Sequence, residues 1–448
     1  MEEESLQFAG DVIVEEISLL AGETLFDMSN FFIEFNLYED VFSPTLHGDV
    51  VISDSANVIT ELPMIGTELL YVKFRTPTLD DSPANLIEKT FQIYSITDRK
   101  LNNDRSQFYA LNFMSLEAYV DNGLVLSQTF SGNTDELATQ MFDKIKSKRK
   151  LNSEDFSELI IYDTPHASEI TYTTCYWSPI KNLSFIGKRV RGNAGSVGTV
   201  MFYESNKGFY FASLEALINF QRTGPGVFDE YVYELVPDSV PRFNPKKYGN
   251  NFPSAMTRIE QISIPKVLDI IDGQDSGYYG SVVRGYDIFS KKMSEVLFDA
   301  RTGLSAFTKT DSGNPIPGDV FIQPSKETQF VSYNSGLYNG YGLTSEDHSD
   351  KVLFRRMYLN SFNQFKFEVT IPGRTDIEVG MLISINYPAA KTKLGDETDI
   401  DDVFDPLISG NYLISAIHHT ISSERHVIRA EIIKNVLLKD LGSRNDST

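Results

Sequence analysis

The sequence predicts a mainly β fold with minor α content, in which two similar antiparallel β-barrel domains share one chain and the second is interrupted by an inserted region. Three observations predict it. Segments that alternate apolar and polar residues dominate both ends of the chain, as expected for strands with one buried face. Two such segments, far apart in the chain, read as the same β-hairpin. A third hairpin, at 200–214, has no partner nearby, so we expect the second copy to be split.

The duplication rests on hairpins at 91–110 and 412–430, each with an apolar strand, a polar turn ending in an acidic residue and an arginine, and a second strand. Arg425 follows Arg105 by 425 − 105 = 320 positions, and the match needs no gap. Upstream, a glycine opens a further strand in each copy, and each of these strands runs into an acidic loop. We interpret the match as a repeat of one domain. The alternative is that antiparallel β domains share glycine turns and alternating patterns in general.

The composition is that of a folded globular chain. Its 448 residues suffice for two to four domains, and 41% hydrophobic and 12% aromatic residues provide for packed cores. The net charge of −22 disfavours general nucleic-acid binding, because phosphates repel an acidic surface. A single cysteine, Cys175, excludes an internal disulfide and a cysteine-based zinc site within one chain, and it fits a reducing compartment.

The sequence also predicts where the protein is made. No apolar run approaches the ~18 residues that a membrane span needs. The acidic start at Met1–Glu4 is opposite in charge to a secretory or mitochondrial leader. We therefore expect synthesis in a cytoplasm and no membrane span.

Residues 1–125 are predicted to form the first barrel domain, and they read almost wholly as strands. A short helix at 57–62 is expected to stop at Pro63. The strand-like segments before the early hairpin are 12–14, 31–38 and 48–52.

Residues 126–198 are predicted to be the first part of a helical and mixed domain. An amphipathic helix is expected over 133–148, where Asn133 and Glu136 are spaced like a capping pair. A second helix is expected from Ser178-Pro179 to Gly192, because serine can cap it and proline fits its first turn. The apolar face of the first helix comprises Leu137, Met141, Phe142 and Ile145.

The remaining residues are predicted to alternate between the second barrel and its insertion. The hairpin within 199–220 is assigned to the first segment of the second barrel domain, and 352–440 to its second segment. The insertion, 221–351, contains a passage rich in Gly, Pro, Ser, Asn and Tyr, from Ser305 to Asp350. This passage is too long for an ordinary loop, so we expect an extended arm that orders against another subunit or partner. Residues 441–448 are predicted to be a flexible tail. Shorter expected elements are strands at 259–264, 281–287 and 365–371 and a helix at 351–362.

No complete catalytic signature occurs, and we predict no catalytic, cofactor-binding or metal-binding residue and no enzymatic activity. A phosphate-binding loop fails because Asn182 stands five residues before Gly187, where a glycine is needed. A serine-hydrolase elbow fails because Ala194–Gly198 lacks the first glycine. A glycosidase carboxylate pair cannot be told from surface charge among 62 acidic residues.

Polar clusters that resemble sites have simpler interpretations. His418 and His419 face opposite sides of a strand, so they are interpreted as polar residues near the end of a hairpin strand and not as metal ligands. The acidic loop 396–405 lacks the glycine and the closing glutamate of a calcium loop, which favours a solvated loop over an ion site. A helix C-terminus at Lys188–Arg191 is favoured over a phosphate site, and core or staple packing is favoured for Tyr176–Trp177.

Nine stretches, none of them a strict motif, carry a family resemblance through their order and spacing: 37–50, 54–55, 62–68, 177–180, 202–204, 208–215, 277–281, 286–287 and 380–435. With them the chain resembles the baseplate hub proteins of contractile-tailed bacteriophages of the T-even type. The first three stretches resemble the amino-terminal tube domain of those proteins. The passage from Ser305 to Asp350 and the acidic loop depart from the family pattern.

The resemblance implies two tube-like β-barrel domains per chain and a homotrimer, whose six similar barrels form a ring of pseudo-sixfold symmetry. Such a ring joins the hexameric tail tube to the trimeric central spike and leaves a channel for DNA during genome ejection. The implied partners are the tail spike protein, the tail tube protein, baseplate wedge proteins and the tape measure protein, with DNA passing through without sequence-specific binding. The implied location is the tail baseplate of the virion, after synthesis in the bacterial host cytoplasm. No cofactor is implied.

Two alternatives stay open. The first is a tail-associated hydrolase that degrades the cell wall. The second is the hub part of a contractile secretion-system spike. That protein normally carries a further β-helical needle, for which the end of this chain at Thr448 leaves no room.

Overall fold

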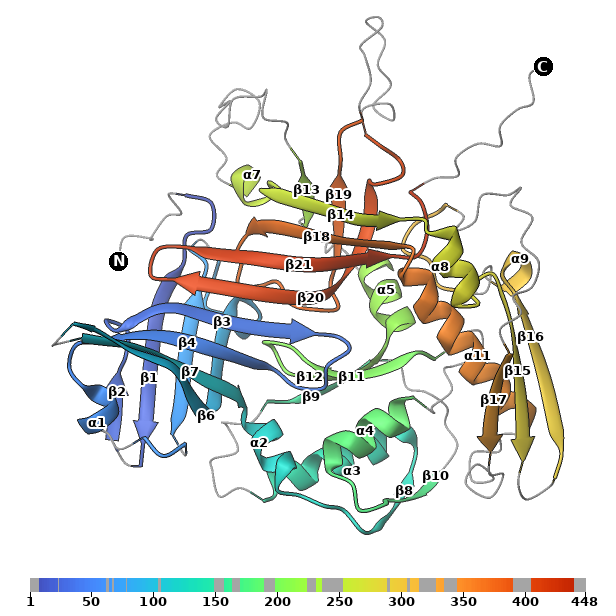
Figure 1. Ribbon diagram of the computed structural model, residues 1–448, viewed down its shortest axis with the longest axis horizontal. Helices are drawn as coiled ribbons and strands as arrows, with labels where there is room; N and C mark the ends of the chain where they lie inside the picture. The colour runs from blue at the N-terminus through green and yellow to red at the C-terminus, as the bar shows by residue number, and fades with distance from the viewer. Residues whose placement is uncertain are drawn as a thin grey trace, which may run out of the picture.

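The computed structural model describes residues 8–438 apart from 23, 62–63, 67, 78, 104–105, 149–156, 163–169, 189–197, 224–230, 236–252, 288–290, 304–306, 314–327, 334–344 and 390–403. It confirms the mainly β fold with minor helix, because a large, largely antiparallel sheet forms the body and smaller sheets and helices flank it (Figure 1). No helix in the described ranges is long and apolar enough to cross a membrane.

The large sheet has thirteen strands among the described residues, seven from residues 13–115 and six from the second half of the chain, beginning at Val232. The first group is β1 (Ile13–Ala21), β2 (Thr24–Asp27), β3 (Phe32–Asp40), β4 (His47–Asp54), β5 (Leu69–Arg75), β6 (Leu86–Asn103) and β7 (Ser106–Ser115). The second group is β13 (Val232–Glu234), β14 (Gln261–Val267), β18 (Phe365–Pro372), β19 (Leu382–Asn386), β20 (Gly410–Ser422) and β21 (His426–Lys434). The strand order is β14, β18, β21, β20, β3, β4, β7, β6, β5, β1 and β2, while β19 pairs with β20 and β13 pairs with β19.

The duplication predicted from the two hairpins is present in this strand order. β4, β7, β6 and β5 are antiparallel neighbours in that order. β18, β21, β20 and β19 repeat the same order with the same antiparallel pairing. β3 pairs with β4 as β14 pairs with β18. We call β3 to β7 repeat 1, and β14 with β18 to β21 repeat 2.

Local details recur as well. Gly66 and Gly380, which open β5 and β19, have φ angles of 87° and 85°, a region that favours glycine. The β6–β7 ladder shifts register between Ile93 and Ser95, and the β20–β21 ladder shifts between Ile414 and Ala416. A bulge bends a strand and strengthens its twist, so both hairpins curve at the same place.

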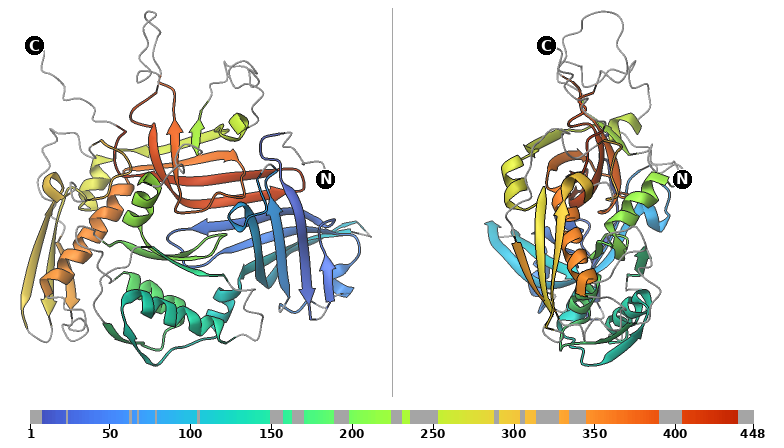
Figure 2. Two further views of the ribbon diagram at one scale, coloured as in Figure 1. Left: turned by 180° about the vertical axis from the view of Figure 1, so that it is seen from behind. Right: turned by 90° about the vertical axis from the view of Figure 1, so that its right-hand side faces the viewer.

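The two repeats form one continuous sheet because β3 pairs with β20, with Glu34–Asp40 opposite Ala416–Ser422. Each repeat nevertheless curls round its own apolar core (Figures 1 and 2). Repeat 2 almost closes on itself, since Glu234 of β13 bridges to Arg258 just before β14. Ile421 of β20 is fully buried in the core of repeat 1, so the joint is also a packing contact.

A glycine in β4 is required by close packing, and its replacement gives a first testable prediction. A Cβ atom at Gly48 would lie 2.1 Å from the Asn36 carbonyl oxygen and 2.5 Å from the Phe113 ring. We expect Gly48→Ala to lower the free energy of unfolding by about 1–3 kcal/mol, as overpacking of a core does. Urea unfolding measures the change. Gly123→Ala is the control, because the nearest atom to its Cβ is 3.6 Å away; equal effects of the two substitutions would contradict the argument.

The helical region has a third core. α3 (Thr134–Lys146) begins with the predicted capping box of Asn133 and Glu136, and α4 (Pro179–Gly187) is capped by Ser178, whose side chain accepts from the Lys181 N–H. α4 ends at Gly187, five residues earlier than expected, and residues 189–197 lie outside the described residues. The other elements here are α2 (Leu116–Asn122), β8 (Thr129–Gly132) and β10 (Ile170–Thr173).

The hairpin assigned to the second barrel has different hydrogen-bond partners from those expected. β11 (Val200–Glu204) and β12 (Phe209–Ser213) form a separate three-stranded sheet with β9 (Leu159–Tyr162), parallel to β12. One face, with Phe202, Phe209 and Phe211, packs in the helical core. The other face, with Tyr203 and Tyr210, packs in the core of repeat 2. The hairpin is therefore a layer between the two regions, held by packing and not by the repeat 2 ladder, and the domain boundaries themselves stay a prediction.

The insertion holds its own sheet, formed by β15 (Gly280–Asp287), β16 (Met293–Asp299) and β17 (Thr328–Tyr333), with α11 (Ser345–Phe362) nearby (Figure 1). The extended arm expected from Ser305 to Asp350 stays a prediction, and the described parts of this passage pack on the same chain. β17 pairs with β15, α11 starts within the passage, and Phe307 packs edge-on against Tyr358 with 5% of its surface exposed. Phe307 buries apolar surface on the same chain, which composition alone does not reveal. Residues 441–448 lie outside the described residues. The other short elements are α1 (Val58–Glu61), η1 (Pro83–Asn85), α5 (Leu214–Thr223), α7 (Pro253–Met256), α8 (Ile270–Asp275) and α9 (Ala300–Gly303).

Candidate functional site: a buried polar junction between the repeats

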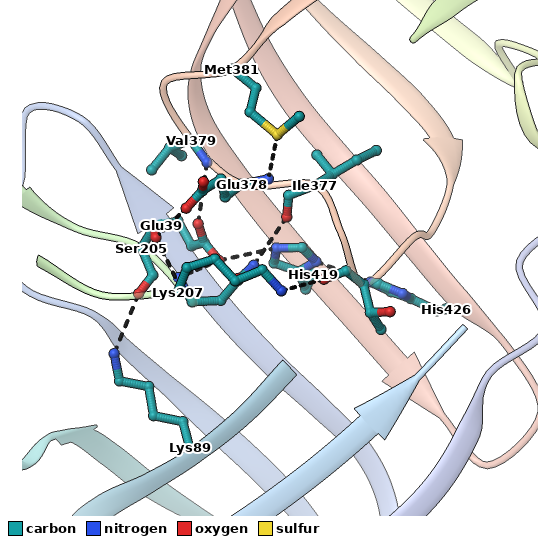
Figure 3. A network of polar contacts seen from close by, with 12 residues as sticks. Glu39, Lys89, Ser205, Lys207, Ile377, Glu378, Val379, Met381, His419 and His426 are labelled. Atoms are coloured by element: carbon teal, nitrogen blue, oxygen red, sulfur yellow. Dashed lines mark hydrogen bonds and ion pairs between the residues drawn. The ribbon is translucent and has the colours of Figure 1, made fainter. Parts of the chain in front are cut away.

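Ionisable side chains gather where repeat 1 meets repeat 2. The turn of the β11–β12 hairpin, Ser205–Lys207, enters between the end of β3 and the segment before β19, and Figure 3 shows the contacts. Charged groups are seldom fully buried unless they are paired, so such a cluster requires an explanation. We call it the junction; its members are Glu39, Lys89, Glu204, Ser205, Asn206, Lys207, Glu378, His419 and His426.

Glu39 is the central carboxylate of the junction, and its side chain is fully buried. It accepts hydrogen bonds from the backbone N–H groups of Asn206 at 3.2 Å and Val379 at 3.3 Å. It therefore ties a strand of repeat 1 to the hairpin turn and to repeat 2. Burial raises the pKa of Glu39 to about 7, although the two N–H donors and nearby lysines oppose the shift.

Two buried histidines continue from Glu39. His419 Nδ1 is hydrogen-bonded to His426 Nε2 at 3.0 Å, and His419 Nε2 lies 3.2 Å from a Glu39 oxygen without hydrogen-bond geometry, so the three side chains are in contact in a row. Burial lowers the pKa of His419 to about 3 and lowers that of His426 well below its usual value, so both rings are neutral near pH 7. A Cβ atom at Gly373 would lie 2.1 Å from the His426 ring, so a glycine is needed beside it.

Lys207 connects the turn to both repeats. Its Nζ donates to the carbonyl oxygens of Leu86 at 2.5 Å, in repeat 1, and of Thr375 at 2.8 Å, between β18 and β19. Burial lowers its pKa to about 8, against the pull of nearby carboxylates. Glu378 accepts from Ser205 Oγ at 2.5 Å and from the Tyr210 hydroxyl at 2.9 Å, and burial raises its pKa to about 7.

An ion pair lies at the outer end of the junction. Lys89 Nζ is 2.6 Å from Glu204, with 7% and 0% of the two side chains exposed. Glu204 also accepts from the Leu46 N–H at 2.8 Å, and Lys89 donates to the Ser205 carbonyl at 3.3 Å. Burial raises the pKa of neighbouring Glu117 to about 7, and the charge of Glu204 adds to the shift.

The geometry of the junction suits a structural role, in which it holds the two repeats together, better than it suits catalysis. His419 contacts both Glu39 and His426, but these side chains are closed to solvent, so a substrate cannot reach them. A pocket of about 430 Å³ opens beside the junction, lined by polar groups that include Lys89, Lys207 and Glu158. In the described part of the chain, no group of three or more His, Cys, Asp or Glu side chains could hold a metal ion.

The structure places His418 and His419 on opposite faces of β20, as predicted. His418 stacks on Tyr38 with ring centroids 4.5 Å apart and lies 2.8 Å from the Asn36 side chain. The interpretation of His419 as a polar residue near a strand end missed the junction. A signal was present, because His419 lies between Ile417 and Ile421 on the apolar face of its strand. Glu39 follows Phe35 and Leu37 in the same way on β3.

The other candidate residues are dispersed. Lys188 is the C-cap of α4, which agrees with the helix C-terminus interpretation. Trp177 packs edge-on against Phe185, but Tyr176 is 75% exposed, so the core interpretation was wrong for Tyr176. Of the acidic loop, Asp405 is described and accepts from the Leu407 N–H in a turn; residues 396–402 lie outside the described residues, as do 191–197 and His166.

Comparison with known proteins shows which fold this chain shares, but it does not assign the chain to a family. No protein-family model and no curated protein matches the chain. Among solved structures, the 43 kDa tail protein of prophage MuSo2 from Shewanella oneidensis matches with a TM-score of 0.52 and 8% identity, covering 94% of this chain and 100% of that one. The tail protein from Neisseria meningitidis MC58 matches with a TM-score of 0.51 and 10% identity, covering 94% and 96%. The fold is therefore shared with these tail proteins over nearly the whole chain.

Proposed function

We propose that this protein is a structural baseplate hub of a contractile phage tail, a trimeric ring that joins the hexameric tail tube to the trimeric central spike. The observation that carries the proposal is a duplicated five-strand unit in a chain that shares its fold, over 94% of its length, with a prophage tail protein and with the tail protein from Neisseria meningitidis. Three chains with two similar units each give six similar units, so one ring can match sixfold symmetry on one side and threefold symmetry on the other.

The junction supports this role. It links the two repeats to each other through Glu39, Lys207 and the hairpin turn, which favours a fixed arrangement of the two. A symmetry adaptor needs such a fixed arrangement and needs no reactive group. The hydrolase alternative would instead need a carboxylate pair that substrate can reach, and the carboxylates of the junction are buried.

The proposed partners are the tail tube and tail spike proteins, baseplate wedge proteins and the tape measure protein, with the virion baseplate as the location. DNA passes through the ring without sequence-specific contacts, and the net charge of −22 keeps the channel wall from holding it. A map of the assembled ring with a neutral or basic channel wall would contradict the last point.

The experiment that tests the hub proposal is a mass measurement. Native mass spectrometry and sedimentation of the purified protein are expected to give three times the chain mass, and averaged electron micrographs are expected to show a ring of six similar densities. A stable monomer that cleaves polysaccharide or peptidoglycan would overturn the proposal in favour of the hydrolase.

A further inference from the structure

Within one chain the two repeats meet through β3 and β20. The two strand edges that could form the equivalent contact, one in each repeat, have no strand partner among the described residues. In repeat 2, the β19 side of β20 is paired with β19 and then with β3 of repeat 1, along Ala416–Ser422. In repeat 1, the corresponding side of β6 is paired with β5 as far as Gln92. From Ser95 to Asn102, that side of β6 has no strand partner among the described residues.

Apolar residues mark the open edge. Leu101 is the repeat counterpart of Ile421 in the hairpin match, and it is 82% exposed, whereas Ile421 is buried in the core of repeat 1. Ile65 precedes Gly66 as Val379 precedes Gly380, and it is 78% exposed, whereas Val379 is 1% exposed and its N–H donates to Glu39 of repeat 1. At both positions the copy that meets the other repeat is buried, and the copy that faces no other repeat among the described residues is exposed.

The complementary edge belongs to β14. Repeat 1 uses β3 to pair with β20, and β14 is the counterpart of β3 in repeat 2. β14 is the last strand of the large sheet, paired with β18 on one side and with no strand along its other side in the described ranges. An open strand edge is a template for pairing with another chain.

We propose that β14 of one chain pairs with β6 of a second copy of this chain, and that this contact repeats between chains the β3–β20 contact within each chain. The register follows from the repeat. Phe35 of β3 lies opposite Ile421 of β20. Ile262 corresponds to Phe35, since Ile262 pairs with Val369 of β18 as Phe35 pairs with Val50 of β4. Ile262 of one chain therefore faces Leu101 of the next.

The contact is head-to-tail, because β14 and β6 are different surfaces. Head-to-tail contacts close into a ring when the rotation between units allows it. The number of chains in the ring rests on the proposed function, which sets three chains and six units. The assignment of β14 and β6 as the two pairing edges does not depend on the proposed function.

A cysteine cross-link tests the register. Opposed residues of an antiparallel pair have Cβ atoms about 4.5–5.5 Å apart, close enough for a disulfide after a small adjustment. In a Cys175→Ser background, which removes the exposed native thiol, the Leu101→Cys/Ile262→Cys variant is expected to form covalent dimers and trimers on mild oxidation. The two single variants are expected to stay monomeric on non-reducing gels, as is Leu101→Cys/Leu297→Cys, whose second site is exposed in the inserted sheet.

A charge at the edge provides the second measurement. Leu101→Asp is expected to shift the native mass from trimer to monomer without changing the thermal unfolding of the monomer, because the side chain is exposed within the chain. Leu25→Asp, at a 63% exposed position of β2, is expected to leave the trimer intact.

The outcomes separate the two proposals. A trimer that resists Leu101→Asp and gives no Leu101–Ile262 cross-link overturns the edge contact and leaves the hub proposal standing. Cross-linked rings with a number of chains other than three would support the edge contact and contradict the trimer. A protein that is monomeric at high concentration and does not cross-link overturns both.

Discussion

Lys89→Met is expected to lower the free energy of unfolding by about 3–5 kcal/mol, because it leaves the Glu204 carboxylate buried without its partner. The Lys89 Nζ lies 2.6 Å from Glu204, and both side chains are almost fully buried. The carboxylate keeps the Leu46 N–H as a donor at 2.8 Å, but one neutral donor does not replace a cation. Urea unfolding at pH 7 measures the change.

Two variants control this result. Lys73→Met breaks an ion pair of similar length, 3.0 Å to Glu15, whose side chains are 28% and 24% exposed. That loss is expected to be about 0.2–1 kcal/mol, because solvent screens the pair. The double variant Lys89→Met/Glu204→Gln is expected to recover much of the loss, because the amide oxygen can still accept from Leu46 and no charge stays buried. A double variant as unstable as Lys89→Met would show that packing, and not charge, causes the loss.

Local sequence signals predicted the repeat well. The β6–β7 and β20–β21 hairpins and the glycines at 66 and 380 lie at corresponding places of two five-strand units with the same order. These signals survive duplication because they meet local needs: a tight turn, and a φ angle that only glycine adopts without strain. The capping box at Asn133 is local in the same way, and it was predicted to the residue.

Contacts between distant segments were not predictable from these patterns. The hairpin of β11 and β12 was recognised, but nothing in its residues names β9 as the third strand, because an apolar strand is compatible with several neighbours. The junction was missed for a related reason. A histidine or glutamate in an alternating strand is usually assigned to the solvent face, and only the strand phase of His419 and Glu39 indicates burial. The partners that make this burial tolerable come from three other segments.

Glu39→Gln is expected to become more stable relative to the wild type as the pH rises from 4.5 to 7. The pKa of Glu39 is about 7 in the folded chain and 4.5 as the ordinary value, so the folded state holds the proton that the unfolded state releases. The stability that protonated Glu39 contributes is complete below pH 4.5 and is lost as the pH rises through 7. Glutamine imitates the protonated form at every pH, so the difference between variant and wild type grows by about 3 kcal/mol across the window.

Urea unfolding of both proteins at several pH values between 5 and 8 measures this difference. The pKa values of His419 and His426 are lowered by burial, so these rings add stability as the pH rises toward 6.5, but they do so in both proteins and cancel in the comparison. Asp80→Asn is the control: the pKa of Asp80 is lowered from 3.8 by hydrogen bonds from Ser82, so its contribution is lost only at lower pH and the difference stays constant from pH 5 to 8. A constant difference for Glu39→Gln as well would mean that solvent or a neighbouring cation stabilises the Glu39 carboxylate, and that the junction is not closed.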